Sequence, residues 1–153
     1  MDTVGMNAVN EVIERAANLT VVEAEQLSAA WDLITRSATR RNERSAAERS
    51  ARHAARDDAW YTAWNALGVA AGEAVEVAAG DDARGYVWDI AGTAVWDAAW
   101  GAAGADVWGA AGDAARDAAQ AASVRDLISD SDYQVLAGPW ESVMGPIFPE
   151  DES

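Results

Sequence analysis

The chain contains no cysteine and no lysine, and only one phenylalanine and three prolines among its 153 residues. The absence of cysteine excludes disulfide bonds and thiolate metal ligands. No window reaches the roughly 18 uncharged apolar residues that a membrane span needs, because Asp89, Asp97 and Asp106 interrupt the tryptophan-rich stretch. The first residues show no basic segment followed by an apolar run. We therefore expect no secretory signal, no membrane association and a cytoplasmic location.

Alanine and tryptophan dominate the apolar half of the composition, with eight tryptophans in the chain. Alanine has the highest intrinsic helix propensity and loses no side-chain entropy on ordering. β-branched residues form no alternating run, so a sheet has no support. We predict an all-α fold in a single helical domain of residues 1–153. Its expected form is an antiparallel helical bundle or a long helical hairpin, with a small C-terminal helical cap at about 129–148.

The N-terminal third carries two helix signals. A first helix is expected from Asp2 or Thr3 to about Ala17. Thr20 and Glu23 then have the spacing of a capping box, in which each side chain bonds the other residue's backbone amide. The residues that follow at 3-4-3 spacing predict one buried stripe: Ala24, Leu27, Trp31 and Ile34.

Bulky apolar side chains then stop. From Thr35 to Ala59 there is no Leu, Ile, Val, Met, Phe, Tyr or Trp. Within this stretch, residues 36–56 contain seven arginines and two glutamates, whereas residues 57–153 contain three arginines and eighteen acidic residues. We expect residues 36–56 to be helical and either to pair closely with another alanine-rich helix or to project into solvent. The chain as a whole has a net charge of −15, so this segment is a basic patch on an acidic body.

Two further helices are expected in the middle of the chain. One should run from Trp60 to Ala78 and end at Gly80-Asp81-Asp82, where glycine suits a C-terminal cap and aspartate caps the next helix. The other should cover about 83–128. Its polar faces before and after Gly101 and Gly104 differ by roughly 150° at about 100° per residue. This switch predicts a break or kink near the two glycines, or a helix that contacts different partners at its two ends.

The remaining local signals concern packing and the C-terminal tail. An imperfect eight-residue repeat begins at Trp100 and at Trp108, and it predicts close helix packing in which glycines let a neighbour approach. Ser129 begins a cluster of N-capping residues. A short helix should follow to Ala137, stopped by 138–139 and continued by one turn to Met144.

The run VRDLISDSDYQVLAGPWESVMGPIFPED, residues 124–151, follows a body rich in Asp-Ala-Ala-Trp and Ala-Ala-Arg-Asp segments. In these features the chain resembles Ala/Trp/Arg-rich helical proteins of actinobacteria and their phages. The resemblance implies an actinobacterial or phage gene. It carries over no activity, cofactor or site residue.

The arginines of residues 36–56 are the first candidate for binding a partner. Arginine offers paired donors to carboxylates and phosphates. Three interpretations stay open: a solvated face that forms ion pairs with the acidic body of the same or another copy, an acidic protein partner, or nucleic acid. Because the acidic body would repel a polyanion, we expect no direct nucleic-acid binding. The candidate side chains are Arg40, Arg41, Arg44, Arg49, Arg52 and Arg56.

The tryptophans are the second candidate. In an alanine-rich core they supply bulk, and we expect Trp31, Trp60, Trp64 and Trp140 to be buried. Four others cannot all share one face of a straight helix, so some should reach the surface or a partner, where tryptophan is typical of binding hot spots. These four are Trp88, Trp96, Trp100 and Trp108.

No catalytic or metal constellation is recognisable. His53 is the only histidine, and with Asp57 it would offer two ligands on an arginine-rich helix. The run from Asp130 to Glu141 matches a calcium loop at its first, third and twelfth positions but has Val135 where the turn needs glycine. We expect no enzyme, no cofactor and no metal. The expected function is that of an interaction protein, an accessory protein of an actinobacterial phage or its host, which binds itself or another protein. The alternative is an acidic nucleic-acid mimic that inhibits a DNA-binding protein.

Overall fold

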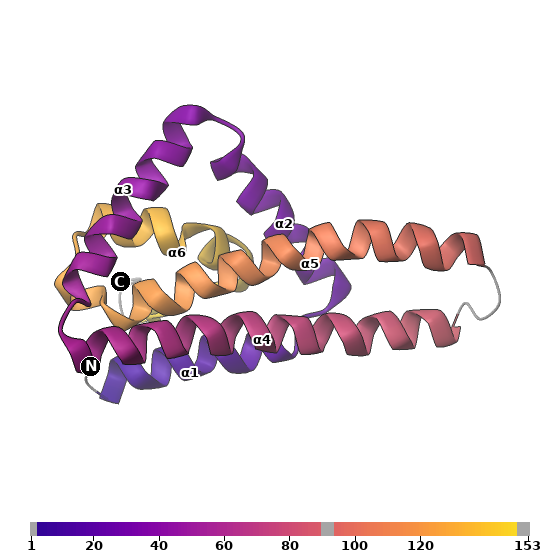
Figure 1. Ribbon diagram of the computed structural model, residues 1–153, viewed down its shortest axis with the longest axis horizontal. Coiled ribbons are helices and arrows are strands. Elements are labelled where there is room, and N and C mark those ends of the chain that lie inside the picture. Colours follow the sequence, from indigo (N-terminus) through magenta and orange to yellow (C-terminus); the bar gives the residue numbers. More distant parts are fainter. Residues whose placement is uncertain (1–2, 90–93, 150–153) are drawn as a thin grey trace.

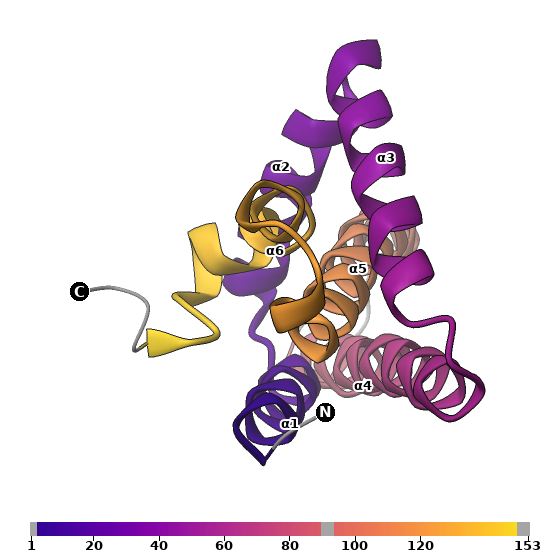
Figure 2. The same cartoon turned by 90° about the vertical axis from the view of Figure 1, so that its left-hand side faces the viewer.

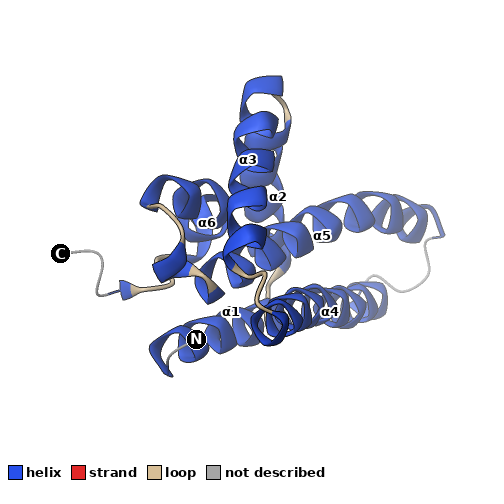
Figure 3. Ribbon diagram, turned by 60° about the vertical axis from the view of Figure 1, so that its left-hand side comes forward, coloured by secondary structure: helices blue, strands red, loops and turns tan. Residues whose placement is uncertain are grey.

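The computed structural model describes the backbone of residues 3–89 and 94–149, and the side chains of this range outside Thr3 and residues 80–106. The described part is all-α, as the sequence predicts, and contains no strand (Figure 3). None of its helices is long and apolar enough to span a membrane. In chain order the elements are α1 (Thr3–Ala17), α2 (Val21–Thr35), α3 (Ala38–Ala54), α4 (Asp58–Asp89), α5 (Ala94–Ser123), the short 3-10 helix η1 (Arg125–Leu127) and α6 (Asp130–Met144).

The two longest helices, α4 and α5, form an antiparallel hairpin (Figure 1). α1 lies along α4, and α2 and α3 meet at an apex on the other side of the hairpin. α6 fills the space between this apex and α5 (Figure 2). The C-terminal half of α5 therefore lies at the centre, against α1, α2, α4 and α6.

The core around α5 consists mainly of alanine methyl groups. Seven alanines of this helix are at most 2% exposed: Ala111, Ala114, Ala115, Ala118, Ala119, Ala121 and Ala122. Larger side chains complete the core beside α6, where Tyr133, Leu136 and Trp140 are buried. Since a methyl group covers little surface, such a core is stable only where many of them are closely packed along long helices.

The predicted helix starts at Thr20 and Ser129 are confirmed. The Thr20 hydroxyl accepts from the Glu23 amide at 3.1 Å, and the Glu23 carboxylate accepts from the Thr20 amide at 3.0 Å. The Ser129 hydroxyl accepts from the Asp132 amide at 3.1 Å. These caps satisfy amides that the first helical turn leaves without an intrahelical acceptor.

Two predicted helix ends are wrong. α4 continues through 80–82 to Asp89, and α6 continues through Gly138 and Pro139 to Met144. Glycine inside a helix costs about 1 kcal/mol and proline about 3 kcal/mol. Packing of α4 along α5, and burial of Trp140 and Met144 in the last two turns of α6, offset these costs.

Of the alternatives predicted for Gly101 and Gly104, a break does not occur, because α5 is continuous from Ala94 to Ser123. The second alternative describes the structure: the N-terminal half of α5 runs beside α4, and the C-terminal half also meets α1, α2 and α6 (Figure 1). The expected helix of 83–128 is instead divided between α4 and α5, and residues 90–93 lie outside the described residues.

Close glycine contacts occur on α4 and not on the described part of the repeat. A Cβ atom at Gly68 would lie 2.5 Å from the Gln120 side chain, and one at Gly72 would lie 2.7 Å from that of Arg116. On α5, a Cβ atom at Gly109 would meet nothing within 4 Å, and at Gly112 it would make ordinary contact with Val75 at 3.7 Å. The prediction that the repeat glycines admit a neighbour is therefore wrong for Gly109 and Gly112.

Gly112→Ala is expected to raise the free energy of unfolding by up to about 1 kcal/mol, because the methyl group fits and alanine favours the helix. Gly145→Ala is the matched control: its φ of 88° is unfavourable for alanine, so a loss of about 1 kcal/mol is expected. Urea denaturation of both variants measures these changes. A destabilised Gly112→Ala variant would contradict the contact geometry.

Candidate interaction surface

Helix α3 has one face of alanines and one of arginines. Ala47, Ala51 and Ala55 are at most 1% exposed, and the helix packs chiefly against α6 and α2. Of the two alternatives predicted for residues 36–56, close pairing with another helix therefore describes the alanine face. Its neighbour α6 is not alanine-rich, however, and buries Tyr133 and Leu136. Small side chains on α3 allow this approach to larger residues of another helix.

Arg44 lies in the same row as the buried alanines and is not part of the free surface. Its Nε and Nη2 atoms donate to the two carboxylate oxygens of Asp117 on α5, at 2.8 and 3.2 Å. Its guanidinium lies 4.5 Å from the ring centre of Trp31, and Glu48 approaches it at 3.7 Å. This bidentate pair orients α3 on the bundle. The prediction that Arg44 binds a partner is corrected, because its side chain is bonded within the chain.

Asp117 is 4% exposed, and its burial has an electrostatic consequence. Burial disfavours the charged carboxylate and raises the pKa of Asp117 to about 6, although the bond from Arg44 acts in the opposite direction. The pKa of Arg44 is also raised: its own burial acts against this, and the bond to Asp117 together with the charges of Asp117, Glu48 and Asp113 outweighs that effect. Near neutral pH the contact is an ion pair inside the protein, where losing one partner leaves the other charge uncompensated.

The remaining five candidate arginines are exposed. Arg41 donates to the Thr35 carbonyl at 2.7 Å, and the guanidinium of Arg52 lies 6.0 Å from the ring centre of Trp64. Among the described residues, none of the five forms an ion pair. We call this set the arginine surface: Arg40, Arg41, Arg49, Arg52 and Arg56.

The structure separates the tryptophans into three groups. Trp31, Trp64 and Trp140 are buried as predicted, while Trp60 is only partly buried. Trp108 is 6% exposed and belongs to the core, so its selection as a partner-binding candidate is corrected: it faces the α4–α5 contact. The side chains of Trp88, Trp96 and Trp100 lie outside the described residues, and their exposure stays a prediction.

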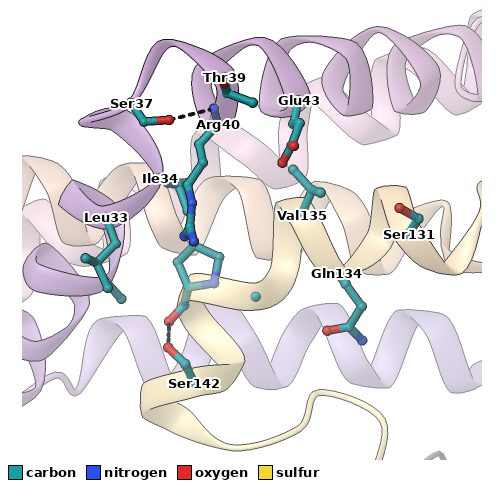
Figure 4. Close-up of a pocket in the computed structure, with 13 residues that line it drawn as sticks. Leu33, Ile34, Ser37, Thr39, Arg40, Glu43, Ser131, Gln134, Val135 and Ser142 are labelled. Atoms are coloured by element: carbon teal, nitrogen blue, oxygen red, sulfur yellow. Dashed lines mark hydrogen bonds between the residues drawn. The ribbon is translucent and has the colours of Figure 1, made fainter.

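A groove of about 640 Å³ opens at the start of α3 and was not predicted from the sequence. It is bounded by the end of α2, the first turns of α3 and one side of α6 (Figure 4). Leu33, Ile34, Val135 and Pro139 form its apolar part, and the side chain of Arg40 extends into it. Leu33 is the residue that could have indicated this groove, because a leucine outside the predicted buried stripe of α2 is expected to be exposed. In the structure Leu33 is 58% exposed.

In the described part of the chain, no group of three His, Asp or Glu side chains is placed to hold a metal ion. Two of the three carboxylates of the calcium-loop match, those of Asp130 and Glu141, have other bonding partners. Asp130 pairs with Arg125 at 2.8 Å, and Glu141 accepts from the Ile147 amide at 2.9 Å and from the Tyr133 hydroxyl at 3.3 Å. These bonds fix η1 and the C-terminal segment onto α6.

The raised pKa of Asp117 gives a pH dependence with a definite sign. Between pH 3.8, the ordinary value, and about 6 the folded chain binds more protons than the unfolded chain, so this group stabilises the fold as pH falls. Relative to Asp117→Asn, which cannot titrate but can still accept from Arg44, the wild-type free energy of unfolding is expected to rise by about 1 kcal/mol from pH 7 to pH 5. Urea denaturation of both proteins at several pH values tests this. A difference that does not change with pH would contradict it.

Comparison with known proteins gave no match: no family model, no curated protein and no solved structure is significantly similar to the chain. The surface features described above are therefore the basis for proposing a function. Two of them are distinct in chemistry: the arginine surface along α3, and the partly apolar groove at the start of this helix.

Proposed function

We propose that this chain is a non-enzymatic interaction protein that binds an acidic protein surface through its arginine surface. The partner is another protein or a second copy of the chain. The observation that carries the proposal is that five exposed arginines, four on α3 and Arg56 just after it, form no ion pair with the described residues, although the chain has 26 acidic residues. Exposed guanidinium groups without a carboxylate partner are available for bidentate bonds to carboxylates of another protein.

The geometry of α3 supports this function. The alanine face and the Arg44–Asp117 pair hold the helix on the bundle, so the arginine surface is presented on a supported element. A rigid presentation lowers the conformational entropy that ordering the surface would cost on binding. An acidic protein is favoured over nucleic acid because the net charge of −15 repels a polyanion.

The alternative function, a nucleic-acid mimic, stays a prediction. It requires carboxylates on one continuous surface, and five of the aspartates concerned lie in residues 80–106, outside the described side chains. An accessory role in an actinobacterial phage or its host likewise stays a prediction.

Removal of positive charge from the arginine surface is expected to weaken binding. In Arg40→Gln/Arg49→Gln/Arg52→Gln, association should weaken by tenfold or more, since each lost contact contributes roughly 0.5–1 kcal/mol at an exposed site. Sedimentation velocity over a range of concentrations measures self-association, and affinity capture with mass spectrometry identifies another partner. Raised salt should weaken either complex.

The matched control is Asn7→Asp/Asn10→Asp/Gln26→Glu, which reaches the same net charge through exposed residues of α1 and α2. It should leave binding nearly unchanged. Equal losses in the two triple variants would show that net charge alone governs association and would remove the role of the arginine surface. A chain that stays monomeric and captures no acidic partner would refute the proposed function.

A further inference from the structure

Helix α4 carries an exposed face that combines carboxylates with aliphatic side chains. Val69 and Val77 are 57% and 61% exposed, and Glu73 lies between them, four residues from each. Glu73 and Glu76 are exposed and form no ion pair with the described residues. Exposed small residues continue this face toward the start of the helix. We call the whole set the acidic stripe: Thr62, Ala66, Val69, Glu73, Glu76 and Val77.

The groove beside α3 is complementary to the acidic stripe in both polarity and charge. Its apolar residues Leu33, Ile34 and Val135 match exposed valines, and Arg40 matches a carboxylate. Arg40 is exposed and has no ion-pair partner among the described residues, and its side chain extends into the groove (Figure 4). A groove lined in this way is typical of sites that accept one face of an amphipathic helix.

We infer that the groove between α2, α3 and α6 binds the acidic stripe of α4 from a second copy of this chain, with Glu73 of that copy bonded to Arg40. The inference rests on the proposed function and names its partner. It commits to a second copy because the groove and its complement are both exposed on the same molecule, and their charges are opposite where they would meet.

Helical geometry assigns Arg40 a different role from the rest of the arginine surface. At about 100° per residue, Arg40 lies roughly 40° to one side of Arg44, whereas Arg52 and Arg49 lie roughly 80° and 140° to the other side. Arg56 follows the end of α3 and does not line the groove. Arg40 therefore borders the groove, and Arg49 and Arg52 face away from it. The two parts of the surface can be tested separately.

Glu43 determines which way round the stripe lies. It lines the groove one turn after Arg40, beside Val135 (Figure 4). A carboxylate of the partner placed near Glu43 would be repelled. The orientation that avoids this places Glu73 and Glu76 toward Arg40, and Thr62 and Ala66 toward Glu43.

Groove and stripe are different surfaces, so the contact between copies is heterologous. Each copy can offer its stripe to one neighbour and its groove to another. Such contacts produce a closed ring if the rotation between copies closes, and an open chain of copies if it does not. Association should accordingly extend beyond a dimer as concentration rises.

A charge exchange between copies tests the contact. Arg40→Glu alone and Glu73→Arg alone should each weaken self-association by roughly tenfold or more, as measured by sedimentation equilibrium. The double variant Arg40→Glu/Glu73→Arg carries both changes in one chain, so the groove of each copy again meets a stripe of opposite charge. Most of the lost association is then expected to return. Both positions are exposed, and circular dichroism checks that both variants remain helical.

Two matched changes serve as controls. Asn7→Asp/Asn10→Asp lowers the net charge by two units, as Arg40→Glu does, and Glu11→Arg raises it by two units, as Glu73→Arg does; all three positions are exposed on α1, outside the groove and the stripe. Asn7→Asp/Asn10→Asp combined with Glu73→Arg in one chain, and Arg40→Glu combined with Glu11→Arg, should show no recovery. Recovery in these combinations equal to that of Arg40→Glu/Glu73→Arg would reduce the effect to net charge and overturn the inference.

The absence of cysteine allows an independent test by cross-linking. Thr39→Cys places one thiol at the groove, and Ala66→Cys places one on the stripe. A short bismaleimide should link the two variants in a mixture more efficiently than it links either variant with itself. The double variant Thr39→Cys/Arg40→Glu should lose this preference for the Ala66→Cys protein. Absence of any preferential link overturns the inference.

The outcomes also separate the two proposals. If the chain stays monomeric but captures an acidic protein through Arg49, Arg52 and Arg56, the second-copy inference is overturned and the proposed function stands. Association can also persist undiminished in both Arg40→Glu and Glu73→Arg but be lost in the triple arginine variant. In that case too, the second-copy inference is overturned and the proposed function stands. If no association of any kind depends on α3, both fail.

Discussion

The structure depends on close packing of alanine methyl groups around the C-terminal half of α5. An alanine side chain removes far less apolar area from water than leucine does, so each contact contributes little. Stability then requires many contacts along long helices, and α4 and α5 are accordingly 32 and 30 residues long. Dispersion attraction falls steeply as atoms separate. The helices around this core must therefore lie close together for the alanine contacts to stabilise the fold.

The alanine face of α3 extends the same principle to a charged helix. Its buried alanines follow Arg44 at spacings of three, four and four residues, so they share one row of the helix. Arg44 ends this row with a bidentate bond to a buried carboxylate. A buried ion pair adds little net stability, but its geometry is demanding and it leaves few alternative orientations of the helix. The pair thereby determines which arginines face outward.

Local sequence signals predicted helix starts better than helix ends. The capping box at Thr20 and the N-cap at Ser129 are confirmed, because a cap is made by residues within one turn. Glycine at 80 and proline at 139 do not end their helices. A terminating residue costs about 1–3 kcal/mol, and this is a small amount beside the packing of a whole helix against its neighbours. Whether it ends the helix is therefore decided by contacts that the local sequence does not contain.

By itself, the sequence determined the all-α class, the start of most helices and the separation of a basic segment from an acidic body, because propensity, capping and charge are properties of neighbouring residues. Only the tertiary structure decided that Arg44 is engaged, that Trp108 is in the core and that a groove opens at the start of α3. Each of these depends on residues that are distant in the chain: Arg44 and Asp117 are 73 positions apart. Burial is a property of what faces a side chain, and the facing residue is known only when the helices are packed.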